Sequence, residues 1–190
     1  MVGRSVGRQV GPGPRRRWAR RRLLASVLVV VLMAVTLASS VLFVWPAADR
    51  PQHVDAVLSL DGPDEKARES RALSLVREGY AHVLLFSVGA HGDTPCPRVR
   101  GVEVVCFVPV PGRTVGEVEY AVRYARKEHW RSLMIVPGHA QATRARLLMG
   151  RCFGGRVVVV PAPVDLWRLP FDVVYEWGAL GKALLVDRQC

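Results

Sequence analysis

Several common enzyme signatures are missing from this sequence. From residue 46 onward it lacks the G-x-G-x-x-G fingerprint of dinucleotide sites, the P-loop and the G-x-S-x-G nucleophile elbow. It has no C-x-x-C motif and no histidine pair at the spacing of metal ligands. These absences predict no metal site and give no support to a dinucleotide cofactor.

Acidic residues are absent from the first 48 positions, which makes the charge distribution uneven. The chain has 27 Lys and Arg against 16 Asp and Glu, a formal net charge of +11. Eight arginines precede residue 23, and the other 19 basic residues nearly balance the acidic ones. A nucleic-acid binder is expected to carry its basic patch on the folded domain. The sequence therefore predicts no nucleic-acid partner.

A long uncharged segment follows the basic residues. Residues 23–45 contain no charged side chain, and about 20 apolar residues suffice to span a bilayer. The arginines before the segment predict a cytoplasmic amino terminus by the positive-inside rule. We expect a basic, irregular tail at 1–22, a transmembrane helix at 23–45, a linker at 46–53 and an extracytoplasmic domain at 54–190.

Two export signals are alternatives to this anchor. A cleaved signal peptide usually has an apolar core of about 7–15 residues, which is shorter than this segment. Cleavage after Ala48 would also place Pro46 at the −3 position, a poor fit to the small-residue rule. A twin-arginine signal at Arg21-Arg22 would be unusually apolar. The uncleaved plasma-membrane anchor is favoured.

All four cysteines follow the apolar segment, as expected in an oxidising compartment. Four cysteines allow three pairings. We favour Cys96–Cys106, which brackets a loop with Pro and Gly, and Cys152–Cys190, which would tie the last helix to the core. A free buried thiol is the alternative for any one of them.

Short apolar runs alternate with amphipathic stretches in the outer domain. Strands are predicted at 53–60, 83–88, 102–108, 132–136 and 157–160. Helices are predicted at 65–78, 114–128, 141–151 and 171–186. This alternation predicts an α/β fold, with a mainly parallel sheet covered on both faces, and leaves the strand order open. Ligands of such sheets bind at the carboxyl ends of the strands, here at 61–64, 87–93, 109–117 and 137–141.

Acidic residues occur at two of these turns. Asp61 and Asp64, on either side of Gly62 and Pro63, fit a metal ligand or a base, but ordinary turn chemistry is favoured. Thr114 and Glu117 fit the S/T-x-x-E capping box, which spacing alone favours over a cleft carboxylate.

The other turns could bind an anion. Ser87 and Gly89 would let backbone amides approach a ligand at the end of a strand. Gly138 and His139 precede the helix that carries Arg144, so that amides and a guanidinium could face one anion. Arg68 could contribute from the first helix of the domain. For both arginines a solvated helix face is an equal alternative, and no orienting partner for His139 is visible.

Several spaced motifs resemble one family. They are Asp55-Ala56-Val57-Leu58, Arg68-x-x-x-Ala72-x-x-Leu75-x-x-x-Gly79, Ser87-x-Gly89, Thr114-x-Gly116-Glu117, Thr143-Arg144-Ala145-Arg146 and Arg151-Cys152-Phe153. Over about residues 54–190 the chain resembles the membrane-anchored YdcF/SanA/ElyC family. The resemblance implies a Rossmann-like three-layer sandwich, a role in the bacterial cell envelope and a cleft lined by Glu117 and Arg144.

The resemblance also bears on the possible cofactors and functions. It allows S-adenosylmethionine or a nucleotide, although the residues themselves predict no cofactor. The family pattern has a histidine where this chain has Gln141, after Pro137 and Gly138, which weakens the case for catalysis. The leading hypothesis is envelope maintenance through an anionic, phosphorylated or lipid-linked ligand. The alternatives are a hydrolase or transferase using Glu117 as its base, and a non-catalytic membrane scaffold.

Overall fold

The computed structural model describes residues 14–62, 65–89, 92 and 94–188. The chain divides into two compact units between Ala38 and Ser39. The second unit therefore begins before the predicted domain boundary at residue 54.

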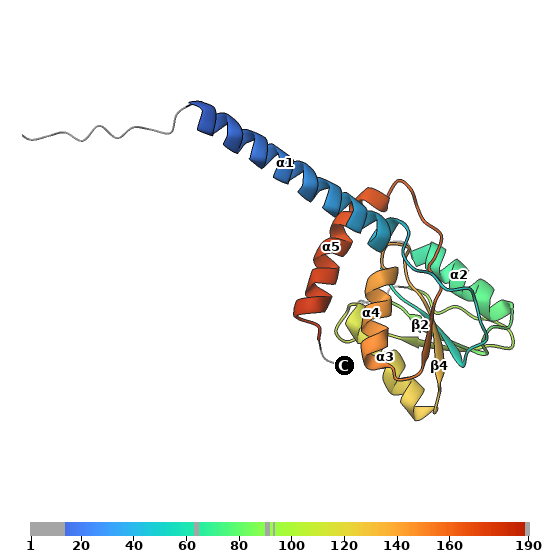
Figure 1. Cartoon of the computed structure of the whole chain (residues 1–190). Helices are drawn as coiled ribbons and strands as arrows, with labels where there is room; N and C mark the ends of the chain where they lie inside the picture. The colour runs from blue at the N-terminus through green and yellow to red at the C-terminus, as the bar shows by residue number, and fades with distance from the viewer. Residues whose placement is uncertain (1–13, 63–64, 90–91, 93, 189–190) are drawn as a thin grey trace, which may run out of the picture. The chain divides into compact units, whose positions relative to one another are not determined.

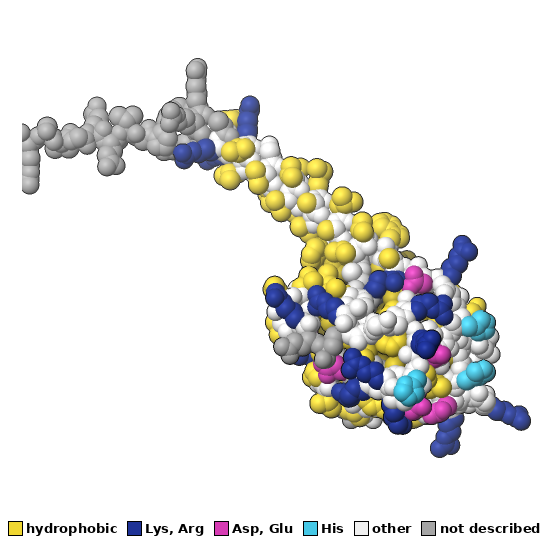
Figure 2. All heavy atoms as spheres, turned by 60° about the horizontal axis from the view of Figure 1, so that its bottom comes forward, with side chains coloured by type: hydrophobic (Ala, Val, Ile, Leu, Met, Phe, Trp, Pro, Cys, Tyr) yellow, Lys and Arg dark blue, Asp and Glu magenta, His cyan; other side chains and the backbone are white. Residues whose placement is uncertain are grey.

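The first unit contains one long apolar helix. Helix α1 (Pro14–Ser39) is followed by a short π-helix, η1 (Ser40–Val44), and the stretch Arg20–Val44 is long and apolar enough to cross a membrane. Beyond the arginines at its start, the face of α1 seen in Figure 2 is covered largely by hydrophobic side chains. Helix α1 already begins at Pro14, within the predicted tail, and residues 1–13 of that tail lie outside the described residues.

The second unit contains a five-stranded, entirely parallel sheet (Figure 1). Its strands are β1 (Ala56–Ser59), β2 (Val83–Ser87), β3 (Glu103–Phe107), β4 (Ser132–Val136) and β5 (Arg156–Val159). Their order across the sheet is β3-β2-β1-β4-β5. The predicted α/β class and parallel sheet are confirmed.

Helices cover both faces of the sheet, which makes three layers (Figure 1). Helices α3 (Thr114–Lys127) and α4 (Ala142–Cys152) pack on the face that carries Leu58 and Ile135. Helix α2 (Glu65–Arg77) packs on the face that carries Val57 and Met134. Neighbouring strand residues thus enter different cores, which explains why the strands are apolar throughout.

The chain reverses direction across the sheet at β1. From β1 it proceeds outward to β2 and β3, then returns to β4 on the other side of β1. Adjacent parallel strands whose connections leave in opposite directions open a crevice at their carboxyl ends. This crevice lies between the loop after Ser59 and the loop after Val136. The strand order therefore selects two of the predicted turns as its walls, the one that begins at Asp61 and the one at 137–141. The predicted turn residues Pro63 and Asp64 lie outside the described residues.

The segment between η1 and β1 is packed on the domain. The Asp49 amide donates to the Val159 carbonyl at 2.8 Å, and the Asp49 carboxylate accepts from the Val159 amide at 2.8 Å. Arg146 of α4 donates to the same carboxylate at 2.9 Å. The predicted linker at 46–53 is thereby held against the edge strand β5.

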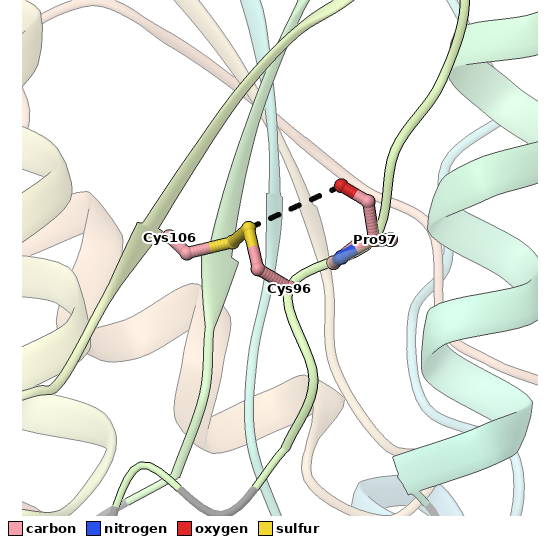
Figure 3. Close-up of a disulfide and its surroundings, with 3 residues drawn as sticks. All are labelled: Cys96, Pro97 and Cys106. Atoms are coloured by element: carbon pink, nitrogen blue, oxygen red, sulfur yellow. Dashed lines mark hydrogen bonds between the residues drawn. A yellow bond between two sulfur atoms is a disulfide. The ribbon is translucent and has the colours of Figure 1, made fainter.

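One predicted disulfide joins the loop after β2 to β3. Cys96 and Cys106 are bonded, with their Cα atoms 6.0 Å apart, and the Cys96 sulfur lies next to the Pro97 carbonyl (Figure 3). This pairing is confirmed. The predicted Cys152–Cys190 pairing lies outside the described residues, because Cys190 is not among them, although Cys152 is not a free thiol.

Gly116 allows α3 to begin against the preceding loop. A Cβ atom built on Gly116 would lie 2.1 Å from the Pro111 carbonyl oxygen and 2.8 Å from the Pro111 nitrogen. Both neighbours are backbone atoms, which cannot rotate away as a side chain could. The glycine of the Thr-x-Gly-Glu motif is thus required by close packing of the helix on its own entry loop.

Replacing Gly116 by alanine is therefore expected to destabilise the domain by about 1–3 kcal/mol, the usual cost of overpacking. Thermal unfolding of the full-length protein in detergent micelles would measure the change. Gly150 is a matched control, since it also lies in a helix but has no atom within 4 Å of the added Cβ. Gly150→Ala is expected to stabilise by about 0.5–1 kcal/mol through helix propensity. Equal effects of the two changes would contradict the packing argument.

Candidate functional site

A small pocket lies at the crevice between β1 and β4. Its volume is about 160 Å³. The lining side chains come from the loops after β1, β3 and β4 and from helices α2 to α5. They are Asp61, Gly62, Arg68, Pro109, Gly112, Arg113, Thr114, Glu117, Gly138, His139, Ala140, Gln141, Arg144, Asp172, Tyr175 and Glu176. Eight of the ten predicted site residues line it, and Ser87 and Gly89 lie immediately beneath.

Glu117 is the buried carboxyl group of the pocket. It accepts a hydrogen bond from the Asp61 amide at 2.5 Å, which joins α3 to the loop after β1. Burial raises the pKa of Glu117 to about 7, although this hydrogen bond and the Ser87 hydroxyl lower it. The nearby Asp61 raises the pKa further, and Arg68 lowers it. Near neutral pH this carboxyl can therefore either give or accept a proton.

The capping-box interpretation of Thr114 and Glu117 is wrong. Helix α3 has Arg113 at its N-cap position with no side-chain capping bond. The Thr114 hydroxyl instead accepts from Gln141 Nε2 at 2.9 Å and from Arg144 at 2.8 Å. Glu117 accepts from Asp61 and not from its own helix terminus. Tertiary partners in the cleft have replaced the local capping partners.

Arg144 is held by a carboxylate of α5 (Leu169–Leu185). Its Nε and Nη2 atoms donate to the two Glu176 oxygens at 2.8 and 2.7 Å, a bidentate geometry. Burial alone would lower the pKa of Arg144, but Glu176 outweighs it and raises the pKa. Three of the five guanidinium N–H donors are used, counting the bond to Thr114, so two are left for a ligand.

Arg68 is the second buried arginine, and two glycines make room for it. Its Nη2 donates to the Gly62 carbonyl, and its Nη1 lies 3.5 Å from Gln141 Oε1. A Cβ atom on Gly62 would lie 2.8 Å from Nη1, and one on Gly138 would lie 3.3 Å from it. The predicted ligand-binding glycines therefore shape the site indirectly, by giving the guanidinium its position.

Gln141 links the helix termini of the pocket. Its Oε1 accepts from the Gly138 amide at 3.0 Å, and its Nε2 donates to Thr114. The amides of His139 and Ala140 have no hydrogen-bond acceptor within the described residues. The start of α4 thus keeps backbone donors available beside two arginines, which is the arrangement that binds anions at helix amino termini.

Ser87 and Gly89 support the pocket from the end of β2. The buried Ser87 hydroxyl faces Glu117 closely enough to lower its pKa, but it makes no hydrogen bond of regular geometry within the described residues. Gly89 has φ of 77°, and a Cβ there would lie 3.2 Å from an Asp61 carboxylate oxygen. Neither residue is among those that line the cavity, but each lies next to one that does, and their direct role in binding stays a prediction.

His139 is tied to the segment after the apolar helix. Its Nε2 lies 2.9 Å from the Val44 carbonyl at the end of η1. On the same side of α4, the Thr143 hydroxyl donates to the Leu42 carbonyl and Arg146 donates to the Ala47 carbonyl at 3.1 Å. The Thr-Arg-Ala-Arg motif thus has two functions. Thr143 and Arg146 hold the segment 42–49, whereas Arg144 faces the pocket.

Eight pocket residues were not predicted as site residues, and five of them are polar. Glu176, Asp172 and Tyr175 come from α5, whose amphipathic pattern predicts only a closing helix. Arg113 comes from the loop before α3, and Gln141 was treated as a departure from the family pattern. The two acidic residues within the largely apolar sequence of α5 were the available signal.

The described residues include no group of three or more His, Cys, Asp or Glu side chains arranged to hold a metal ion. In comparisons with protein-family models, curated proteins and solved structures, nothing matches the chain.

Proposed function

We propose that this chain is a single-pass plasma-membrane protein of the YdcF/SanA/ElyC type. Its extracytoplasmic Rossmann-like domain binds an anionic or phosphorylated envelope metabolite and works in envelope maintenance or biogenesis. The observation that carries the proposal is the convergence of two buried arginines and two helix amino termini on one pocket at the β1/β4 crevice.

Charge and cysteine chemistry support the proposed topology. Arginines cluster at the start of the candidate span Arg20–Val44, and the positive-inside rule places that end in the cytoplasm. The folded domain, on the other side, contains the Cys96–Cys106 disulfide, which is typical of oxidising compartments. Both arguments favour the same orientation.

The size of the pocket favours a small charged group as its occupant. A volume of about 160 Å³ is below the roughly 300–1,000 Å³ usual for sites that enclose drug-sized ligands. A phosphate group suits it better than a whole nucleotide or S-adenosylmethionine. An adjoining groove of about 330 Å³ shares Thr114 and Arg144 with the pocket and continues along α5 past Ala179. The groove would take the remainder of a phosphorylated or lipid-linked molecule.

Ligand binding by the full-length protein in detergent micelles tests the proposal. Inorganic phosphate, undecaprenyl phosphate and a nucleotide sugar are the probes, and calorimetry and thermal unfolding are the measurements. We expect at least one phosphorylated probe to raise the melting temperature. Arg144→Lys should weaken its binding roughly 10–100-fold, because a charge-assisted hydrogen bond is worth about 1.5–3 kcal/mol.

Arg146 gives a matched control. It lies two residues further along α4 and is also paired with a carboxylate, Asp49, but it is not among the pocket residues. Arg146→Lys should leave the affinity unchanged. No shift with any anion, or equal losses in the two variants, would refute the proposed site.

Glu117 favours a second candidate function, hydrolysis or group transfer. A carboxyl whose pKa is about 7 is suited to proton transfer at neutral pH, and it lies in the pocket beside two arginines. If the protein turns over a phosphorylated envelope substrate, Glu117→Gln should abolish turnover and retain binding. Turnover that survives this change excludes Glu117 as the base. Binding without any turnover favours a non-catalytic protein.

A further inference from the structure

Helix α5 exposes apolar side chains along its outer face. Phe171 is 77% exposed, Val174 is 75% exposed and Leu185 is 70% exposed. Their spacing of three and then eleven residues places them on one side of the helix. Trp167, just before the helix, is 90% exposed. Together they form an apolar stripe on this side of the helix, which the exposed Lys182 interrupts near its end.

The acidic residues of α5 are turned the other way. Glu176 is buried against Arg144, and Asp172 lines the pocket. A helix that covers a water-soluble domain normally buries its apolar stripe and exposes its charges. In α5 the carboxylates face the protein, and apolar side chains face outward as well as inward, where Leu180 and Ala183 are buried. A helix that is apolar on its outer side as well as its inner side is suited to a non-aqueous environment.

Direct contacts join α5 to the end of the candidate membrane span. The Phe43 and Trp177 rings meet edge to face with centroids 5.4 Å apart, and Trp177 Nε1 donates to the Ser39 hydroxyl at 2.9 Å. Phe43 is completely buried in a cluster with Leu180 and Ala140. Residues 39–44 are the last of the span and also part of the folded domain. The helix therefore sits at the level where the span ends.

We propose that α5 lies in the outer interface of the bilayer, with the stripe of Trp167, Phe171, Val174 and Leu185 inserted among the lipids. The inference rests on the membrane anchoring in the proposed function. Trp167 and Tyr175 are the amphipathic aromatic residues favoured at this depth. The helix is fixed to the end of the span through Phe43 and Ser39, so anchoring brings its outer face to the lipid surface and the pocket behind it close to the membrane.

Site-specific photo-crosslinking of the full-length protein in bacterial membranes tests this placement. A benzophenone amino acid would replace Phe171 or Val174 in the stripe, Val30 in α1, or Arg77, which is exposed on α2 across the sheet. Illumination with labelled phospholipids and mass spectrometry of the protein then detects lipid adducts. We expect lipid adducts at positions 30, 171 and 174 and no lipid adduct at position 77.

The pattern of adducts tests the placement of α5 separately from the membrane anchor of the proposed function. Adducts at 30 but none at 171 and 174 overturn the placement of α5 and leave the anchor intact. No adduct at 30 overturns the anchor itself. Crosslinks from 171 and 174 to a second copy of the chain, without lipid, would show that the stripe is a dimer interface and would also overturn the inference.

Discussion

Replacing Glu176 by alanine is expected to lower the free energy of unfolding by about 3–5 kcal/mol, the usual cost of removing one partner of a buried ion pair. The Arg144 and Glu176 side chains are only 10% and 5% exposed. Without Glu176, the guanidinium keeps the Thr114 hydroxyl as its hydrogen-bond partner among the described residues, and water cannot easily replace the carboxylate. Denaturant unfolding of the full-length protein in micelles would measure the loss.

Two further variants show whether the loss comes from the unpaired charge. Glu128 pairs with Lys127 on the surface, and Glu128→Ala should have little effect because solvent screens the pair. The double change Arg144→Met with Glu176→Leu removes both charges and should recover much of the stability, since apolar pairs often replace buried ion pairs well. A double variant that is less stable than Glu176→Ala would refute this explanation.

The stability of the domain is expected to fall between about pH 4.5 and pH 7 because of Glu117. Its pKa is raised from 4.5 to about 7 in the folded protein, mainly by burial. As pH rises through this range, the unfolded chain releases the proton while the folded protein retains it, so the unfolded state is favoured progressively. The total contribution is about 3 kcal/mol, and it levels off above the folded-state pKa.

Glu117→Gln isolates this effect, because glutamine cannot ionise. Between pH 4.5 and pH 8, the wild type should lose about 3 kcal/mol of stability relative to the variant. Melting temperatures over this pH range provide the comparison. Parallel pH profiles would mean that the pKa of Glu117 is the same in the folded and the unfolded protein, so that its environment is more polar than its burial implies.

The fold could be predicted from the sequence because its signals are local. Apolar runs and helical spacing follow from the environment of each segment, and α2 begins at Glu65 and β4 spans Ser132–Val136, as predicted. The order of the strands could not be predicted, since every strand is apolar on both faces. Nothing local marks β1 as the centre of the sheet.

Only the turns that form the site, at the carboxyl ends of the strands, could be predicted from the sequence, and not the contacts among their side chains. Thr114 and Glu117 match a capping box by spacing, but Arg144, Gln141 and Asp61 approach from distant segments and take over their hydrogen bonds. The partner of Arg144 lies 32 residues away on α5. Such pairings depend on how helices meet in space, and a single sequence carries no direct record of that geometry.

The central place of β1 in the sheet has a consequence for biogenesis. This strand is made before the other four, yet its two neighbours are β2 and β4. One of its edges therefore remains unpaired until residues 132–136 have been synthesised and have reached the same side of the membrane. An unpaired apolar edge is a template for aggregation. Chains truncated before β4 should consequently be substrates for proteases and chaperones, whereas truncation after β5 leaves every neighbour of β1 in place.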